Sequence, residues 1–496
     1  MLQHLGYTML IEGHTAPKIQ YLCTMRHRLT WLLIFTICGG LRAQQNPWYV
    51  GNWSGELQAF GTRLTLTFHV VDSPSVKAFM SVPMQGASRI PADECSVKGK
   101  SIRITLSAFN IQYEAQVQGD SLIGTFTQSG RSFPLALAKR LDKHFPQTPK
   151  EPFPYGSREV QFHSLDGRIR FAGTFTYPNQ EARACIVLFS GSGTQDRDER
   201  IGEHVPFAVW ADTFTRMGFA VLRVDDRGSG LTIGQPSAIQ NTRLEDLFND
   251  GKAYVKALKS QPESGWKPDS TGLPIYLLGH SQGAAIACHL LAEGIEGVQG
   301  AIGLSPWAYS GRRVNREQNY ASTFAVIHDS AVTNDFLLMH DNLIELAVNR
   351  QAQTTEEDWK NAVELAWKNC GHQRFIRKAF QKMGVRDLPD YLALQYKQIE
   401  GFMLDFILFD PLVDIQAAQA PILWVQGSSD VQVQARTLKE IALAYSKKIE
   451  YVELAGHNHL LQPCQTCTVD EYFQIETTVG PKAIQAVCAW LQKQNP

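Results

Sequence analysis

The pattern of apolar and polar residues changes once along this chain of 496 residues. From Trp48 to about residue 140, short runs alternate apolar and polar residues, as in Arg63-Leu-Thr-Leu-Thr-Phe-His-Val-Val and Ser101-Ile-Arg-Ile-Thr-Leu. Alternation with a period of two, rich in β-branched and aromatic residues, is typical of antiparallel strands with one buried face. Residues 46–145 are therefore predicted to form a small all-β barrel or sandwich with a lipocalin-like rhythm.

A Pro-rich stretch, residues 146–153, reads as a linker. Beyond it, over residues 154–496, an opening hairpin pattern is followed by short apolar runs that alternate with amphipathic stretches of helical period. Ala184-Cys-Ile-Val-Leu-Phe-Ser is one such apolar run, and Leu244 to Leu258 is one such helix. This alternation predicts the α/β fold class, with a mostly parallel, doubly wound sheet covered by helices on both faces.

The strand rhythm stops between about residues 312 and 414. Asn334 to Ala347 and Thr355 to Trp367 have the period of amphipathic helices. Such an insertion is predicted to form a helical cap, which excludes water and shapes the substrate pocket of an enzyme.

The amino terminus has the composition of an export signal. Arg26 and Arg28 precede a short apolar stretch, and a plausible cleavage site ends at Ala43. Because such signals begin at the initiator methionine, Met25 is predicted to be the true start, and residues 1–43 are interpreted as leader and signal peptide. The protein is therefore expected to be exported and to be periplasmic or secreted after cleavage near Ala43.

Composition and net charge limit the classes of protein to which this chain can belong. Hydrophobic residues make up 44% and charged residues 19% of the chain, as in ordinary globular proteins. The net charge of −1 gives no reason to expect a nucleic-acid partner. No apolar run past the leader approaches the ~20 residues that span a bilayer, so no membrane span is expected.

The stretch Leu277-Leu-Gly-His-Ser-Gln-Gly-Ala-Ala carries the strongest chemical signal. It reads as an apolar strand, a sharp turn and the start of a helix, and it contains the G-x-S-x-G pattern of a nucleophile elbow. A serine at such a turn projects its hydroxyl clear of the sheet, while the helix N-terminus offers free N–H groups to a developing oxyanion. Ser281 is therefore the predicted nucleophile.

A serine hydroxyl needs a base, and the base needs an acid that fixes its tautomer. Where a nucleophile elbow carries the serine, the acid follows the serine along the chain, in a loop after a buried strand. Asp430 follows the apolar run that begins at Ile422 and is the predicted acid; Asp405, Asp410 and Asp414 are alternatives without a clean strand before them.

Two histidines after the last predicted strand compete for the role of base. They are His457, in a Gly-His pair, and His459, in Asn-His-Leu-Leu-Gln, and the residues alone leave the choice between them open. His280 and His289 are interpreted as packing residues.

The oxyanion hole is expected to combine two backbone N–H groups. One is that of Gln282, next after the nucleophile, and the other is that of Ser192, with Gly193 in reserve, in the loop after an apolar strand. A phosphate-binding loop is the competing interpretation of Gly191-Ser-Gly, but no Lys-Ser/Thr or further glycine completes a nucleotide fingerprint.

Residues 154–496 resemble an α/β hydrolase of the serine aminopeptidase S33 type, close to bacterial exported esterases that have an N-terminal β domain. The motifs that carry this resemblance occur in family order and are Gly191-Ser-Gly-Thr-Gln-Asp-Arg-Asp-Glu, Asp226-Arg-Gly-Ser-Gly, Gly279-His-Ser-Gln-Gly, Gly427-Ser-Ser-Asp and Asn458-His-Leu-Leu-Gln. The resemblance implies the α/β-hydrolase fold and a serine hydrolase. Its Asn-His-Leu pattern implies that His459 is the base, with His457 as the alternative or as a neighbour that buttresses the site. Asp196, Arg197, Asp198 and Arg227 within these motifs are interpreted as ion pairs that anchor loops.

The expected activity is cleavage of carboxylic esters through an acyl-enzyme on Ser281, without metal or organic cofactor. Two alternatives remain: an aminopeptidase acting on short peptides, and a non-catalytic binding protein whose β domain holds carbohydrate or a surface. Cys464 and Cys467 are expected to form a local disulfide or to remain free thiols rather than to bind zinc.

Overall fold

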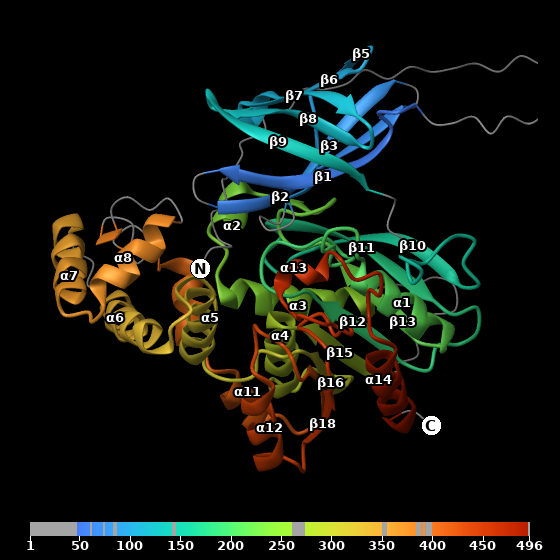
Figure 1. Ribbon diagram of the computed structural model, residues 1–496. Helices are drawn as coiled ribbons and strands as arrows, with labels where there is room; N and C mark the ends of the chain where they lie inside the picture. The colour runs from blue at the N-terminus through green and yellow to red at the C-terminus, as the bar shows by residue number, and fades with distance from the viewer. Residues whose placement is uncertain are drawn as a thin grey trace, which may run out of the picture.

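The computed structural model describes residues 47–59, 62–72, 75–82, 87–140, 145–259, 273–349, 355–382, 388–389, 392 and 399–494. These residues form two sheets, one after the other along the chain, and a separate helical lobe (Figure 1). The predicted signal peptide lies outside the described residues.

The first sheet is antiparallel throughout and has nine strands in the order β4-β3-β2-β1-β9-β8-β7-β6-β5. They are β1 (Gly51–Ala59), β2 (Thr62–Asp72), β3 (Val76–Val82), β4 (Ala87–Pro91), β5 (Glu94–Lys98), β6 (Ser101–Leu106), β7 (Ile111–Gln118), β8 (Ser121–Gln128) and β9 (Arg131–Arg140). The two outermost strands, β4 and β5, follow one another with only Ala92 and Asp93 between them. The sheet therefore curls into a half-barrel, as the alternating pattern predicts.

Alternation decides which side chains fill this half-barrel. Along β7 every second residue from Ile111 to Ala115 is buried and the residues between them are exposed. The interior holds large apolar side chains, among them Trp53 and Phe126, with Phe68 stacked on Tyr113 at 5.2 Å between ring centroids. Burial of about 150–250 Å² by each aromatic ring makes this cluster the main source of the domain's stability.

The second sheet has the order β10-β11-β13-β12-β15-β16-β17-β18, with β14 beside β11. Its strands are β10 (Gly156–His163), β11 (Ile169–Tyr177), β12 (Cys185–Phe189), β13 (Ala220–Val224), β14 (Ile233–Gly234), β15 (Ile275–His280), β16 (Val298–Leu304), β17 (Ile422–Gly427) and β18 (Ile449–Leu454). The β10–β11 hairpin and the β11–β13 pair are antiparallel, and all neighbours from β13 to β18 are parallel. The predicted α/β class with a mostly parallel sheet is confirmed.

Helices cover both faces of this sheet. On one face lie α1 (Pro206–Arg216) and α14 (Pro481–Gln494), which bury Trp210 and Trp490 against the strands. The other face is covered by α3 (Leu244–Lys259), α4 (Gln282–Ala292), α11 (Pro411–Ala417) and α12 (Ala435–Ala444). Two short helices, α2 (Pro236–Gln240) and α13 (Val469–Tyr472), lie toward the β domain (Figure 1).

The predicted cap region forms a helical lobe beside the sheet (Figure 1). Its helices are α5 (Gly311–Ile327), α6 (Ser330–Val348), α7 (Glu356–Lys368), α8 (Gln373–Lys382) and α10 (Gly401–Leu408). Thr355 and Asp358 form a capping box that starts α7, because each side chain accepts a hydrogen bond from the other's backbone N–H. The lobe has its own core around Phe336, Trp359 and Trp367.

Two contacts place the β domain and the linker against the second domain. Gln147 of the linker accepts hydrogen bonds from the N–H groups of Thr478 and Val479, just before α14. Glu203, in the loop after β12, lies 3.9 Å from His69 of β2. In Figure 1 the β domain lies on the side of the second domain that carries α2 and α13.

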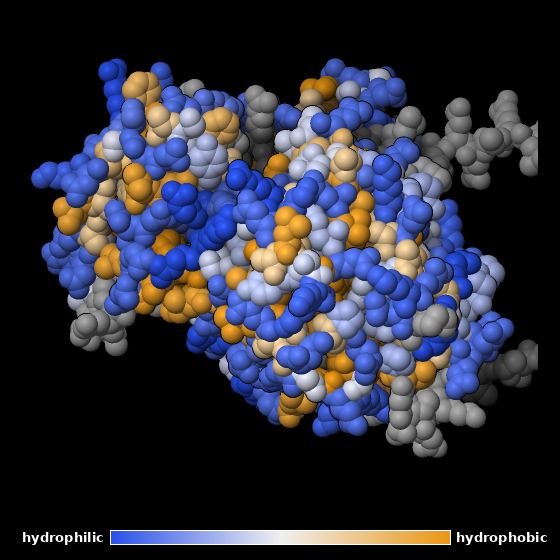
Figure 2. Space-filling model, turned by 90° about the horizontal axis from the view of Figure 1, so that it is seen from below, coloured by the Kyte–Doolittle hydropathy of each residue, from blue (hydrophilic) through white to orange (hydrophobic). Residues whose placement is uncertain are grey.

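The face opposite the β domain carries hydrophilic and apolar residues side by side (Figure 2). Among the residues that the structure describes, no helix combines the length and hydropathy needed to cross a bilayer.

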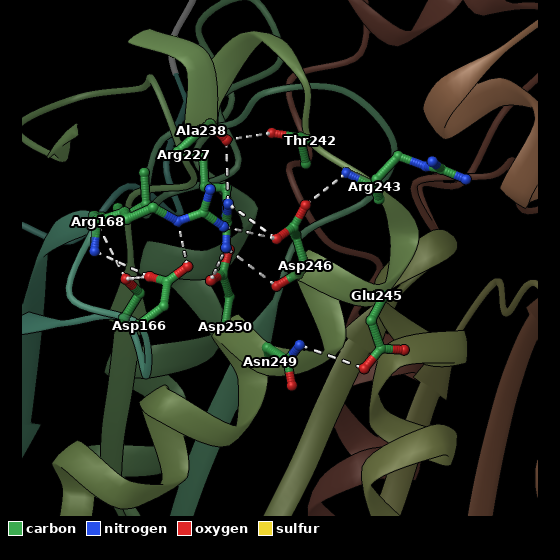
Figure 3. A network of polar contacts seen from close by, with 12 residues as sticks. Asp166, Arg168, Arg227, Ala238, Thr242, Arg243, Glu245, Asp246, Asn249 and Asp250 are labelled. Carbon is green, nitrogen blue, oxygen red and sulfur yellow. Dashed lines mark hydrogen bonds and ion pairs between the residues drawn. The ribbon is translucent and has the colours of Figure 1, made fainter. Parts of the chain in front are cut away.

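One buried ion pair joins the loop after β13 to α3 (Figure 3). Arg227 donates from two of its nitrogens to the Asp250 carboxylate, with Nη2 to Oδ1 at 2.7 Å, and Nη1 donates to the Ala238 carbonyl at 3.2 Å. Asp246 flanks the same guanidinium at 3.5 Å and accepts a hydrogen bond from the backbone N–H of Arg243. Burial raises the pKa of Asp250 to about 6 even though Arg227 lowers it, so the arginine is needed to keep this carboxylate ionised.

Arg227→Ala is expected to lower the free energy of unfolding by about 3–5 kcal/mol, because it leaves the buried Asp250 carboxyl group without its cation and its two donors. Replacing both residues, as in Arg227→Met with Asp250→Leu, is expected to recover most of that loss. Urea unfolding at pH 7 measures both effects.

Arg243→Ala provides the matched control. Arg243 pairs with Asp405 of α10 at 2.5 Å, but its side chain is 53% exposed, so the loss should stay below about 1 kcal/mol. Equal losses for the buried and the exposed arginine would contradict the argument from burial.

Candidate active site

Ser281 lies at the turn between β15 and α4, with φ 50° and ψ −112°. This left-handed φ is rare for residues other than glycine and persists only where surrounding contacts hold it. The Ser281 N–H donates to the Leu304 carbonyl of β16 at 2.9 Å, and the Ser281 carbonyl accepts from Trp307 N–H at 3.0 Å. The structure thus places the predicted nucleophile on a strained strand-to-helix turn.

The glycines on either side of this turn are required by close backbone contacts. A Cβ atom at Gly279 would lie 2.1 Å from the carbonyl oxygen of Gly283, and a Cβ at Gly283 would lie 2.1 Å from that of Phe189. Any side chain at either position would push α4 away from β15 and β12. The G-x-S-x-G spacing is therefore a packing requirement as well as a motif.

Asp430 and His459 meet in the loops after β17 and β18. His459 Nδ1 donates to Asp430 Oδ2 at 2.7 Å, and both side chains are buried. The other carboxylate oxygen, Oδ1, accepts the N–H groups of Gln432 at 2.7 Å and Val433 at 3.0 Å, while Gln426 Nε2 adds a bond to Oδ2 at 2.9 Å. Burial alone would raise the pKa of Asp430, but His459 and these donors hold it below its usual value.

The loop that carries His459 is shaped by its two amide neighbours. Asn458 Oδ1 accepts the N–H groups of Leu460 and Gln462, each at 3.0 Å, and Asn458 Nδ2 donates to Gln462 Oε1 at 2.9 Å. These bonds close a tight turn around His459 and give the asparagine and the glutamine of this motif a structural role.

His457 has a different environment. Its Nδ1 contacts the Ala455 carbonyl at 2.9 Å. Its Nε2 is buried near Gly480 and has no hydrogen-bond partner in the part of the chain that the structure describes. Of the two candidate bases, His459 is the one hydrogen-bonded to Asp430. Asp405, Asp410 and Asp414, the alternative acids, lie on α10 or at the start of α11; Asp414 pairs with His289 at 3.0 Å.

The predicted oxyanion loop lies against the elbow. A Cβ atom at Gly191 would lie 3.6 Å from Ser281 Cβ, so the backbone of this loop is close to the predicted nucleophile. The Gly191 N–H already donates to the Glu199 carboxylate at 2.6 Å, so it does not face the reaction centre. The predicted donors are the N–H groups of Ser192 and Gln282. Neither donates a hydrogen bond to another described residue. Their role as an oxyanion hole stays a prediction.

The far side of this loop is fixed by Asp226. Its Oδ2 accepts Ser190 Oγ–H at 2.8 Å and the Gln195 N–H at 2.9 Å. Burial raises the pKa of Asp226 to about 7, against the lowering effect of these two donors. The carboxyl therefore changes its charge near neutral pH.

The interpretation of the remaining charged residues of these motifs as ion pairs is confirmed. Arg197 pairs with Asp225 at 2.7 Å, Asp198 contacts Arg223, and Arg200 lies 3.4 Å from Asp196. None of these groups contacts Ser281 or His459 among the described residues.

Cys464 and Cys467 form a disulfide next to the loop that carries the two histidines. Glu471 accepts hydrogen bonds from the N–H groups of Gln465 and Thr466 within that disulfide loop, both at 2.8 Å. Within the described residues, no group of three or more histidine, cysteine or acidic side chains is arranged to bind a metal ion.

Sequence reasoning assigned no role to Glu199 or Asp226, although both stand in the quoted motifs. Glu199 contacts His280, which is 81 positions away in the chain, and Asp226 contacts Ser190, 36 positions away. In the sequence, each is an acidic residue in a Gly-rich motif, and this pattern does not reveal which residue it contacts.

Comparison with known proteins gives a family match over part of the chain. Residues 180–351 match the family described as serine aminopeptidase, S33. The matched segment includes the predicted oxyanion loop and Ser281 but ends before Asp430 and His459. No characterised protein matches the chain by sequence.

Several solved structures are similar to this one. An esterase from Pyrococcus furiosus shares 16% identity over 71% of this chain and 97% of its own, with a TM-score of 0.40. An alpha/beta hydrolase from Penicillium sp. sh18 shares 18% identity over 68% and 99%, with a TM-score of 0.39. A thermophilic esterase from Thermogutta terrifontis shares 16% identity over 68% and 100%, with a TM-score of 0.37.

The pKa of Asp226 predicts a pH-dependent stability. Between about pH 4 and pH 7 the folded carboxyl keeps a proton that the unfolded chain releases, so rising pH favours unfolding. Relative to Asp226→Asn, the wild type should lose up to about 1.4 kcal/mol of unfolding free energy per pH unit in this window and nothing further above it. Urea unfolding at pH 5, 6, 7 and 8 measures the difference.

The neighbouring residue gives the control. Burial would raise the pKa of Asp225, but Arg197 and two backbone donors hold it below its usual value. The difference between the wild type and Asp225→Asn should therefore stay constant from pH 5 to pH 8. A constant difference for Asp226→Asn as well would refute the assignment of a raised pKa.

Proposed function

We propose that this protein is an α/β hydrolase and that it cleaves carboxylic esters through an acyl-enzyme on Ser281. The observation that carries the proposal is the buried hydrogen bond of 2.7 Å between His459 and Asp430, in loops that lie next to the elbow. A histidine held in this way has its Nδ1 proton fixed, which leaves Nε2 as a base.

In the proposed first half-reaction, Ser281 Oγ attacks the acyl carbonyl carbon while its proton passes to His459 Nε2. The negative charge that develops on the carbonyl oxygen is stabilised by the N–H groups of Ser192 and Gln282. Asp430 stabilises the imidazolium through the bond to Nδ1 without taking up the proton. Collapse of the tetrahedral intermediate breaks the ester C–O bond, and the departing alcohol receives the proton from His459.

In the second half-reaction, water replaces the alcohol. His459 accepts a proton from the water as its oxygen attacks the acyl carbon, and it returns that proton to Ser281 Oγ as the carboxylic acid leaves. The substrate is a small-molecule ester. Bond-making and bond-breaking need only the side chains and N–H groups named here.

Cleavage of short peptides is the second candidate, because the matched family is described as a serine aminopeptidase. The triad would act in the same way on an amide, so the substrate and not the machinery separates the two activities. A third candidate is a non-catalytic binding protein whose β domain holds carbohydrate or a surface, and this candidate requires Ser281 to be unreactive.

We also propose that the protein is exported after cleavage near Ala43. The disulfide between Cys464 and Cys467 supports this, because such bonds persist in oxidising compartments. N-terminal sequencing of the protein recovered from the periplasm or medium should begin at residue 44, and recovery only from the cytosol with an intact leader would reject export.

The activity is tested by hydrolysis of p-nitrophenyl acetate and butyrate beside aminoacyl p-nitroanilides. Ser281→Ala and His459→Ala should each lower kcat for the esters by at least about 10³-fold. His457→Ala, the matched histidine two positions away, should change kcat by less than about tenfold, since among the described residues its ring makes no hydrogen bond to Asp430.

The outcomes separate the candidates. Ester turnover that depends on Ser281 and His459 supports the esterase, and turnover of anilides alone supports the peptidase. A large loss in His457→Ala with normal activity in His459→Ala would overturn the choice of base. Absence of turnover on both panels by folded protein would favour the binding protein.

A further inference from the structure

A second charged pair lies directly behind the elbow. His280, the residue before Ser281, contacts Glu199 with 2.8 Å between Nδ1 and Oε1. Both residues are almost entirely buried, Glu199 at 2% and His280 at 7% exposure. The reaction steps proposed above use neither residue.

Glu199 also binds the oxyanion loop. The same oxygen, Oε1, accepts the Gly191 N–H at 2.6 Å, one residue before the predicted donor Ser192. A Cβ atom at Gly191 would lie 3.1 Å from Glu199 Oε1 and 3.2 Å from His280 Nδ1, so the loop is packed directly onto the pair. The position of the Ser192 N–H therefore depends on the Glu199 carboxylate.

His280 binds the base loop through its other nitrogen. Its Nε2 lies 3.1 Å from the backbone carbonyl oxygen of His459, and the two imidazole rings are 4.9 Å apart. A neutral imidazole has one N–H donor and one lone pair, so it can donate to only one of two oxygen acceptors. Since both nitrogens of His280 face oxygen atoms, an ionised Glu199 requires the doubly protonated imidazolium, which donates to Glu199 from Nδ1 and to the His459 carbonyl from Nε2.

We propose that Glu199 and His280 form a charged positioning pair that holds the oxyanion loop and the base loop at fixed distances from Ser281. This inference rests on the proposed function and deepens it. Neither residue touches substrate; each acts through the backbone of a neighbour, Gly191 for one and His459 for the other. A displacement of about 1 Å in either loop is enough to cost 10²-fold in rate.

The electrostatics agree with the geometry. Burial would lower the pKa of His280, but the charge of Glu199 and the hydrogen bonds to Glu199 and His459 raise it above its usual value. The charged groups that act on His280 are Glu199 from the oxyanion loop and Asp430 from the acid loop, with the His459 ring beside it. The raised pKa agrees with the imidazolium that the two contacts of His280 require, and loss of this proton as the pH rises is expected to release one of the two loops.

Glu199→Gln separates charge from shape. The amide oxygen still accepts the Gly191 N–H, but the counter-ion of His280 is gone, so the alkaline limb of the kcat profile should move to lower pH. At pH 6 the variant should approach the wild-type kcat, whereas at pH 8.5 its kcat should be at least about tenfold lower. Glu199→Asp, which keeps the charge, should restore the position of the alkaline limb.

Glu203→Gln is the matched control, since it makes the same acid-to-amide change on the same loop at a side chain that is 38% exposed. It should have the wild-type profile. A purely structural role for Glu199 would instead lower the amount of folded protein or kcat equally at every pH.

A second measurement reads the charge of His280 without turnover. Imidazole ¹⁵N spectra of histidine-labelled full chain, assigned with His280→Asn, should show the imidazolium at pH 7.5 in the wild type and a neutral ring in Glu199→Gln. A neutral His280 in the wild type would overturn the proposal. This readout needs only the wild type, so it stands even if Glu199→Gln does not fold.

The two levels of inference can fail separately. Ester turnover by the wild type with an unchanged pH profile in Glu199→Gln would overturn the positioning role and leave the esterase intact. No turnover by the folded wild type on esters or anilides would overturn the proposed function, and the positioning role with it.

Discussion

The close contact of three backbones at the nucleophile elbow is the constraint on which the rest of the site depends. Gly283 lies so near the Phe189 carbonyl at the end of β12 that no side chain fits, and Gly279 contacts Gly283 in the same way. These contacts hold Ser281 at a left-handed φ and bring the loop after β12 within reach of its hydroxyl. Strain at one residue is thereby balanced by the packing of a whole helix against two buried strands.

Acidic side chains hold the loops around this elbow. Asp430 fixes His459, Asp226 fixes the start of the oxyanion loop, and Glu199 with His280 lies between the two. Each carboxyl group accepts at least one backbone N–H group as well as a side-chain donor, so acidic side chains hold loops that have no regular secondary structure. The two domains meet close to this region, because Glu203, which contacts the β domain, is only four residues from Glu199.

Local patterns in the sequence predict the elements well, because period and length are local properties. The strand before Ser281, the alternation in the half-barrel and the helices on both faces of the second sheet all follow from them. The choice of His459 over His457 came from a motif, and in the structure Asn458 and Gln462 of that motif close the turn that carries His459.

What the sequence could not predict are contacts made between distant loops. His280 reads as a packing residue, since the variable position of the elbow carries no signal of its own, and the ion pair with Glu199 exists only after β12 and β15 have paired in parallel. The raised pKa of Asp226 depends in the same way on burial by segments that the motif does not contain.

The central claim is that Ser281 is a reactive nucleophile, and covalent labelling tests it most directly. A fluorophosphonate probe added to the folded full chain should label one serine, which peptide mass spectrometry should identify as Ser281, and Asp430→Asn should slow the labelling. Labelling at another serine, or none on folded protein under conditions in which a control serine hydrolase reacts completely, would contradict the account.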